Sequence, residues 1–108
     1  MNRWEIRYLP EAIVELKHLN RSVQPEILKG IRKVAQNPGY PDGYGKPLGN
    51  LAGSHLAGLY KIKFKKAGLR VVYGLEIQDG VMTVIIISAR ADNAVYEEAE
   101  KRRLKYGL

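Results

Sequence analysis

The sequence predicts one α+β domain over residues 1–108, with helices packed on an antiparallel sheet. Two observations support this prediction. A chain of 108 residues has the length of one ordinary domain. Strand-like and helix-like apolar patterns also follow one another without internal repeats or linkers, in the order β-α-α-β-β-β-α.

The N-terminal part is expected to be a strand followed by a helix. Trp4, Ile6 and Tyr8 alternate with charged side chains, which predicts a half-buried strand at about residues 2–9. Pro10 ends this strand. Proline suits the first turn of a helix, because an amide hydrogen there has no partner within the helix. We therefore expect a first helix from Pro10 to about residue 20.

A second helix follows, so that the two form a short antiparallel hairpin. Asn20-Arg21-Ser22 provides a turn and an N-cap. Asn37-Pro38 ends the helix, since the residue before a proline disfavours helical geometry. The apolar stripe of this helix consists of residues three or four apart, namely Val23, Ile27, Ile31 and Val34.

A long loop is expected at residues 37–58. This segment holds six of the eleven glycines and three of the five prolines, which argues against a regular element. Leu48, Leu51 and Leu56 are expected to tether it. Loops of this length in compact domains tend to be functional or disordered.

Three strands and a terminal helix complete the predicted fold. The strands are expected at residues 59–66, 69–77 and 81–89, joined by turns at Ala67-Gly68 and Asp79-Gly80. The last strand is apolar almost throughout, which predicts a central position covered on both faces. The terminal helix is expected to begin at a cap, Asp92 or Asn93, and to end at Gly107.

The positive charge of the chain is concentrated in its middle third. The formal net charge is +7, and residues 43–75 carry six basic and no acidic side chains. In the predicted sheet, Lys61 and Lys63 share one face, Arg70 lies within reach of it, and Arg90 ends the last strand. Such a cluster favours a phosphate-bearing partner. An exposed lysine face is also a common device against edge-to-edge aggregation, and this alternative stays open.

Several kinds of site are excluded or disfavoured by the residues present. Cysteine is absent, which excludes disulfides, thiolate nucleophiles and cysteine-ligated metals. His18 is expected at the surface, and His55 in the glycine-rich loop has no second histidine near it for acid–base catalysis. No long apolar span or signal peptide is present, which predicts a cytoplasmic protein. Any catalysis would depend on lysine, arginine and tyrosine.

Residues 59–104, together with the K-P-L-x-x-L motif that precedes them, resemble the RelE branch of the RelE/ParE toxin superfamily. The predicted order of elements agrees with a RelE-like fold. The resemblance implies a type II toxin that acts as a ribosome-dependent endoribonuclease, cuts mRNA in the ribosomal A site and is neutralised by a cognate antitoxin.

The resemblance also implies the site residues. The Y-K-I-K strand supplies Lys61 and Lys63, the next strand supplies Arg70, and the end of the last strand supplies Arg90, with Tyr96 six residues later. Ala89 and Ala91-Asp92 flank Arg90, where the family is often more basic. Three further lysines are assigned to general attraction toward ribosomal RNA: Lys46, Lys65 and Lys66.

A mechanism without metal or cofactor follows as a hypothesis from these residues. A lysine among other cations gives up its proton more easily, so Lys61 or Lys63 would activate the 2′-OH. The other lysine and Arg70 would hold the phosphate, and Arg90 would stabilise the leaving oxygen. Tyr96 would stack on or orient a nucleotide base.

Two alternative functions stay open. The first is a ParE-like protein that would inhibit DNA gyrase without cutting RNA. The second is a nucleic-acid-binding module or a toxin relative without activity. The expected partners are an antitoxin, the ribosome and mRNA, with no membrane. An acidic, amphipathic antitoxin segment would suit a basic cleft or an apolar groove beside the terminal helix. Promoter binding by the antitoxin complex is left open.

Overall fold

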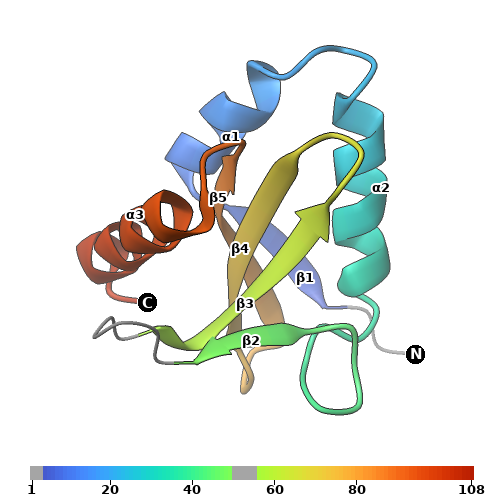
Figure 1. The fold of residues 1–108 in the computed structure, drawn as a ribbon. Helices are drawn as coiled ribbons and strands as arrows, with labels where there is room; N and C mark the ends of the chain where they lie inside the picture. The colour runs from blue at the N-terminus through green and yellow to red at the C-terminus, as the bar shows by residue number, and fades with distance from the viewer. Residues whose placement is uncertain (1–3, 50–55) are drawn as a thin grey trace.

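A computed structural model describes residues 4–49 and 56–108 (Figure 1). Their eight elements confirm the predicted α+β class and contain the seven predicted elements in order. In chain order the elements are β1 (Glu5–Tyr8), α1 (Pro10–Lys17), α2 (Gln24–Val34), β2 (Lys46–Gly49), β3 (Leu56–Phe64), β4 (Leu69–Glu76), β5 (Val81–Ser88) and α3 (Asp92–Tyr106).

The eighth element, β2, lies in the segment predicted to be a loop, so that prediction is wrong at residues 46–49. It is also wrong at residues 56–58, because β3 begins at Leu56 and not at residue 59. Strand β2 pairs antiparallel with β3, with Lys46 opposite Lys61. Leu48 is buried and holds the strand to the core. Pro47 and Gly49 argued against a strand in the sequence, because both residues are rare within strands. Both are nevertheless tolerated in a strand at the edge of a sheet.

The five strands form one sheet in the order β1-β5-β4-β3-β2. The prediction of a purely antiparallel sheet is wrong, because β1 runs parallel to β5, with Glu5 opposite Val81. The strand β1 precedes both helices in the chain and lies at the edge of the sheet, next to β5. The predicted central place of the last strand is confirmed, since Val81–Ile87 are all buried.

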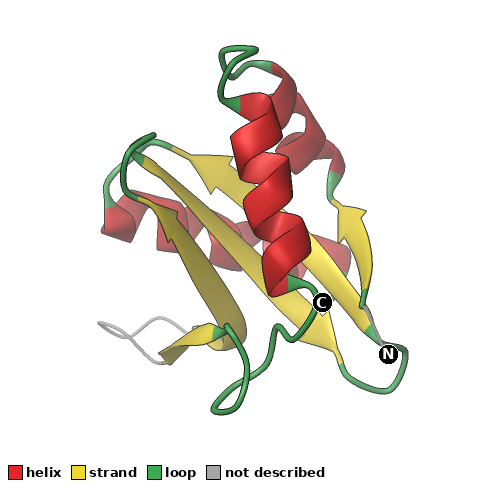
Figure 2. Ribbon diagram, turned by 90° about the vertical axis from the view of Figure 1, so that its right-hand side faces the viewer, coloured by secondary structure: helices red, strands yellow, loops and turns green. Residues whose placement is uncertain are grey.

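The predicted helical hairpin is confirmed, and Figure 2 shows α2 running alongside the sheet. Its stripe of Ile27, Ile31 and Val34 is buried. Gly30 allows this close approach, because the ring of Phe64 on β3 occupies the space that a Cβ would need. The predicted side-chain cap is absent. Val23 is the N-cap residue and makes no cap hydrogen bond with its side chain.

Helix α3 packs Val95, Tyr96 and Ala99 into the hydrophobic core and is also held by polar contacts. Arg102, only 9% exposed, bonds to Glu15 of α1 and to the carbonyl oxygen of Ile85 on β5.

The predicted cap at Asp92 or Asn93 is wrong, because the N-cap residue is Ala91 and no side chain caps the helix. The predicted end is confirmed, since Gly107 follows Tyr106 in the left-handed conformation (φ 68°). Within the described ranges, no helix has the length and hydropathy to cross a bilayer.

Candidate functional site

The predicted cations gather on one face of the β2-β3-β4 part of the sheet. Lys63 lies directly opposite Arg70 in the pairing of β3 with β4. Lys61, two residues earlier on β3, lies opposite Lys46 on β2. Residues directly opposite in an antiparallel pair, and residues two apart on one strand, share a face. The sheet therefore brings together four of the predicted site residues.

A carboxylate from another element completes this cluster. Asp92, the first residue of α3, forms an ion pair with the Arg70 guanidinium through its Oδ1. Its Oδ2 lies 3.5 Å from the Lys63 ammonium nitrogen. The expected cluster of cations without a carboxylate is thus not what forms, because the acid-free stretch 43–75 meets Asp92 in space. We refer to Lys46, Lys61, Lys63, Arg70 and Asp92 as the strand cluster.

Asp92 is ionised in this setting. Partial burial acts to raise the pKa of the carboxyl group, but the positive charges of Arg70 and Lys63 and their hydrogen bonds outweigh it, so that the pKa falls below its usual value. The carboxylate therefore neutralises part of the positive charge. From the sequence, Asp92 was expected only as a helix cap and as an acidic neighbour of Arg90. A usable signal was present, since this acid lies two residues after Arg90.

Arg90 joins the cluster through its backbone. Its carbonyl oxygen accepts a hydrogen bond of 3.0 Å from the Arg70 guanidinium, and its amide donates to the Ser88 hydroxyl at 3.1 Å. These two contacts fix the chain between β5 and α3. The Arg90 residue is exposed, so its side chain extends from an anchored backbone at the margin of the strand cluster.

Tyr96 does not lie where the predicted base stacking needs it. Its side chain is 5% exposed and belongs to the hydrophobic core, so the ring has no free face for a nucleotide. The hydroxyl is buried and has no hydrogen-bond partner among the described residues. Burial raises the pKa of Tyr96, with a further contribution from the charge of Asp92. Tyr96 is therefore a neutral group beneath the strand cluster.

A groove adjoins the cluster at the turn between β3 and β4. Its volume is about 290 Å³, and Lys63, Lys65 and Arg70 contribute to its lining. Lys66 is exposed in the same turn. The lysines predicted to attract RNA thus lie on both sides of Lys61 and Lys63, with Lys46 on β2 and Lys65 in the turn.

The structure describes one of the two histidines. His18 is an exposed residue that ends α1, as expected, and His55 lies outside the described residues. In the part of the chain that the structure describes, no three His, Cys, Asp or Glu residues come together as metal ligands.

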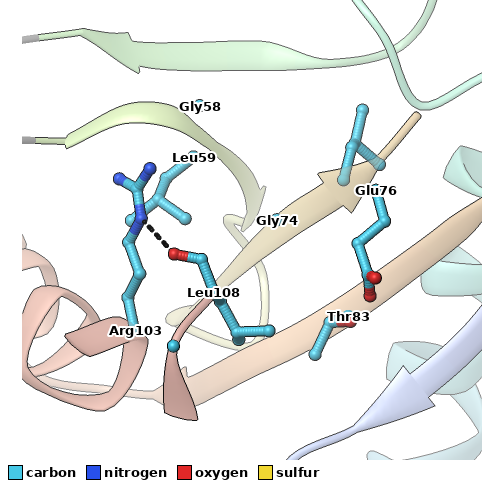
Figure 3. A pocket seen from close by; sticks show the side chains of 9 residues that line it. Gly58, Leu59, Gly74, Glu76, Thr83, Arg103 and Leu108 are labelled. Carbon is cyan, nitrogen blue, oxygen red and sulfur yellow. Dashed lines mark hydrogen bonds between the residues drawn. The ribbon is translucent and has the colours of Figure 1, made fainter. Parts of the chain in front are cut away.

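A second cavity, of about 230 Å³, lies beside the end of α3 (Figure 3). Leu59 of β3 and Thr83 of β5 line its sheet side. Arg103 and Leu108 line the other side, and the Arg103 guanidinium donates a hydrogen bond of 3.2 Å to the carbonyl oxygen of Leu108. The cavity lies beside the terminal helix, but polar residues share its lining with apolar ones.

Comparisons with known proteins place this geometry in context. No protein-family model matches the chain. An Escherichia coli protein described provisionally as a RelE-like toxin is 26% identical over 100 residues, which are 93% of this chain and 97% of that protein. The mRNA interferase toxin RelE of Escherichia coli K12 is 29% identical over 96 residues, covering 86% of this chain and 90% of the relative.

Solved structures agree with these sequence relatives. A double mutant of the E. coli toxin RelE in its free state superposes with a TM-score of 0.74 at 26% identity, covering 94% of this chain and 98% of that one. The same mutant bound to a peptide of the antitoxin RelB gives a TM-score of 0.65 at 25% identity, covering 91% and 95% of the two chains.

Proposed function

We propose that the chain is a type II toxin of the RelE kind that cleaves mRNA in the ribosomal A site, since RelE-like toxins of E. coli are 26% and 29% identical to it. The observation that carries the proposal is the cross-strand pair Lys63 and Arg70, with Lys61 beside it on the same face. Closely spaced cations on a rigid sheet suit a phosphodiester, whose charge increases as it is attacked.

The proposed reaction is attack by the ribose 2′-OH on the adjacent phosphate. The bond from the 2′-oxygen to phosphorus forms and the bond from phosphorus to the 5′-oxygen breaks, leaving a 2′,3′-cyclic phosphate and a 5′-OH. One group must take the proton of the 2′-OH, and another must supply a proton to the leaving 5′-oxygen. The reaction needs no net change in oxidation state.

We assign the base to Lys61. Lys63 has Asp92 as an ionic partner, whereas Lys61 has Lys46 opposite it across the strands. The ionic contact with Asp92 engages Lys63, so the role of base falls to Lys61. Lys61 is also only partly exposed.

Lys63 and Arg70 are assigned to the phosphate, and Arg90 to the leaving oxygen. Arg70 has a planar guanidinium that suits two phosphate oxygens at once. Arg90 belongs to a backbone segment fixed by Arg70 and Ser88, which keeps this exposed residue close to Arg70. A guanidinium stays charged in proteins, so Arg90 would stabilise the developing negative charge, with water as the proton source.

Partners and surroundings follow from the same proposal. Lys46, Lys65 and Lys66 would contact ribosomal RNA, which implies a cytoplasmic protein. No step in the proposed reaction requires a metal or cofactor. A cognate antitoxin is the further partner, since a related toxin has been solved with a peptide of its antitoxin. An acidic, amphipathic segment of it would suit the positive charge of this chain.

The proposed activity is tested by sequencing the 5′ ends of mRNA after brief expression of the chain in a bacterium. Cleavage within codons, dependent on translation, is expected. A matched control is Arg7→Ala, which removes an arginine from β1, at the opposite edge of the sheet from β2. Growth arrest with intact mRNA would instead support the gyrase-inhibitor alternative, and normal growth an inactive relative.

A further inference from the structure

We propose that Asp92 is an affinity-determining residue that competes with the RNA phosphate for Arg70 and Lys63. This inference rests on the proposed function, because it assumes that these two cations bind a phosphodiester. A carboxylate and a phosphate bind guanidinium and ammonium groups through the same kind of charge-assisted hydrogen bond. One anion must therefore leave before the other can make full contact.

The contacts of Asp92 match those of a bound anion. One of its oxygens meets the Arg70 guanidinium and the other faces the Lys63 ammonium at 3.5 Å, so that the carboxylate bridges two strands. The Asp92 side chain is 40% exposed, and Lys63 is 38% exposed. An RNA backbone can thus approach the same cations from solvent, by way of the groove beside Lys63 and Arg70.

Displacement of Asp92 is feasible because α3 does not depend on it. The helix is held at its far end by Arg102, bonded to Glu15, and by Lys105, bonded to Glu11 at 3.0 Å. A released Asp92 also keeps a favourable position, since a carboxylate in the first turn of a helix interacts well with the helix dipole.

The buried Tyr96 hydroxyl is a second, independent observation, because its hydrogen bonding is unsatisfied in the free protein. It lies one helical turn after Asp92 and has no hydrogen-bond partner among the described residues. Buried hydroxyl groups normally have a partner. The charges of Asp92 and Arg70 both act on it, which places it close to the pair that RNA would separate.

The test compares Asp92→Asn with the unaltered chain in binding a short, fluorescently labelled 2′-O-methyl RNA, which lacks the attacking hydroxyl. The control is Asp79→Asn, which removes the same charge in the turn at the opposite end of β4 from Arg70. We expect Asp92→Asn to bind about three- to tenfold more tightly, the effect of freeing one charge pair, and its salt dependence to steepen by about one phosphate contact. The control should change affinity by less than about twofold.

Two results would overturn the inference. If the Asp92→Asn variant binds the RNA as tightly as the Asp79→Asn variant, the carboxylate does not compete with the phosphate. Weaker binding than the unaltered chain would mean that Asp92 orients the cations instead. Asp92→Ser, which also suits a helix start, repeats the test if Asp92→Asn is poorly folded by circular dichroism. Binding of uncleavable RNA does not require nuclease activity, so failure of the proposed function is detected separately.

Discussion

The guanidinium of Arg102 on α3 donates hydrogen bonds of 2.9 and 2.8 Å to the two carboxylate oxygens of Glu15 on α1. Glu15 also accepts a hydrogen bond from the backbone amide of Ile87 on β5. One carboxylate therefore joins both helices to the central strand. Because the Arg102 side chain is only 10% exposed, its positive charge has little contact with water and is stabilised mainly by these hydrogen bonds.

Glu15→Ala is expected to lower the free energy of unfolding by about 2 to 3 kcal/mol, because it leaves a mostly buried guanidinium without its main partner. Urea denaturation measures the change. Glu5→Ala is the matched control, since Glu5 also pairs with an arginine, Arg7, but both side chains are more than half exposed. The control should cost less than about 1 kcal/mol. Equal losses in the two variants would contradict the role given to Glu15.

Tyr73→Phe is expected to destabilise the fold by about 1 to 2 kcal/mol. The buried Tyr73 hydroxyl donates a hydrogen bond of 2.8 Å to the carbonyl oxygen of Pro38, which ties the segment before β2 to the sheet. The phenylalanine ring would keep the stacking on Tyr60. Tyr40→Phe, at a residue 65% exposed, is the control and should leave the urea midpoint unchanged. An unchanged midpoint for Tyr73→Phe would contradict this anchoring role.

Acid is expected to weaken the attachment of α3 through Glu11. Hydrogen bonds from its own backbone amide, from Lys105 and from Tyr106 lower the pKa of Glu11 from 4.5 to about 2. A pKa lowered by folding stabilises the fold above the unfolded value, and this stabilisation is lost as the pH falls from about 4.5 to about 2. Glu11→Gln should therefore flatten the dependence of stability on pH across that window. An unaltered pH profile would contradict the assignment.

Much of the fold could be predicted because local patterns and tertiary contacts agree. The apolar run of β5 predicted its burial, and the spacing of Ile27 and Ile31 predicted the buried face of α2. The missed strand β2 has no such pattern, since its pairing with β3 comes from a contact distant in sequence. The parallel pairing of β1 likewise comes from a distant contact, because its partner β5 lies near the other end of the chain.

The candidate site was predictable in its cations and not in its anion. Alternation along β3 placed Lys61 and Lys63 on one face, and the turn after them placed Arg70 opposite Lys63. Charge counting along the chain could not reveal Asp92, because it approaches from a helix that begins beyond β5. The burial of Tyr96 was equally hidden, since an aromatic residue near a helix start is compatible with either exposure or burial.

The central claim is that the strand cluster cleaves mRNA on the ribosome, and the most direct measurement is single-turnover cleavage of mRNA in programmed ribosomes by purified protein. We expect Arg70→Ala and Arg90→Ala each to slow cleavage by at least about a hundredfold, as loss of transition-state charge stabilisation does, while Arg7→Ala cleaves normally. All three variants should keep the circular dichroism of the unaltered chain. An Arg70→Ala, Arg90→Ala double variant that cleaves at the normal rate would contradict the account.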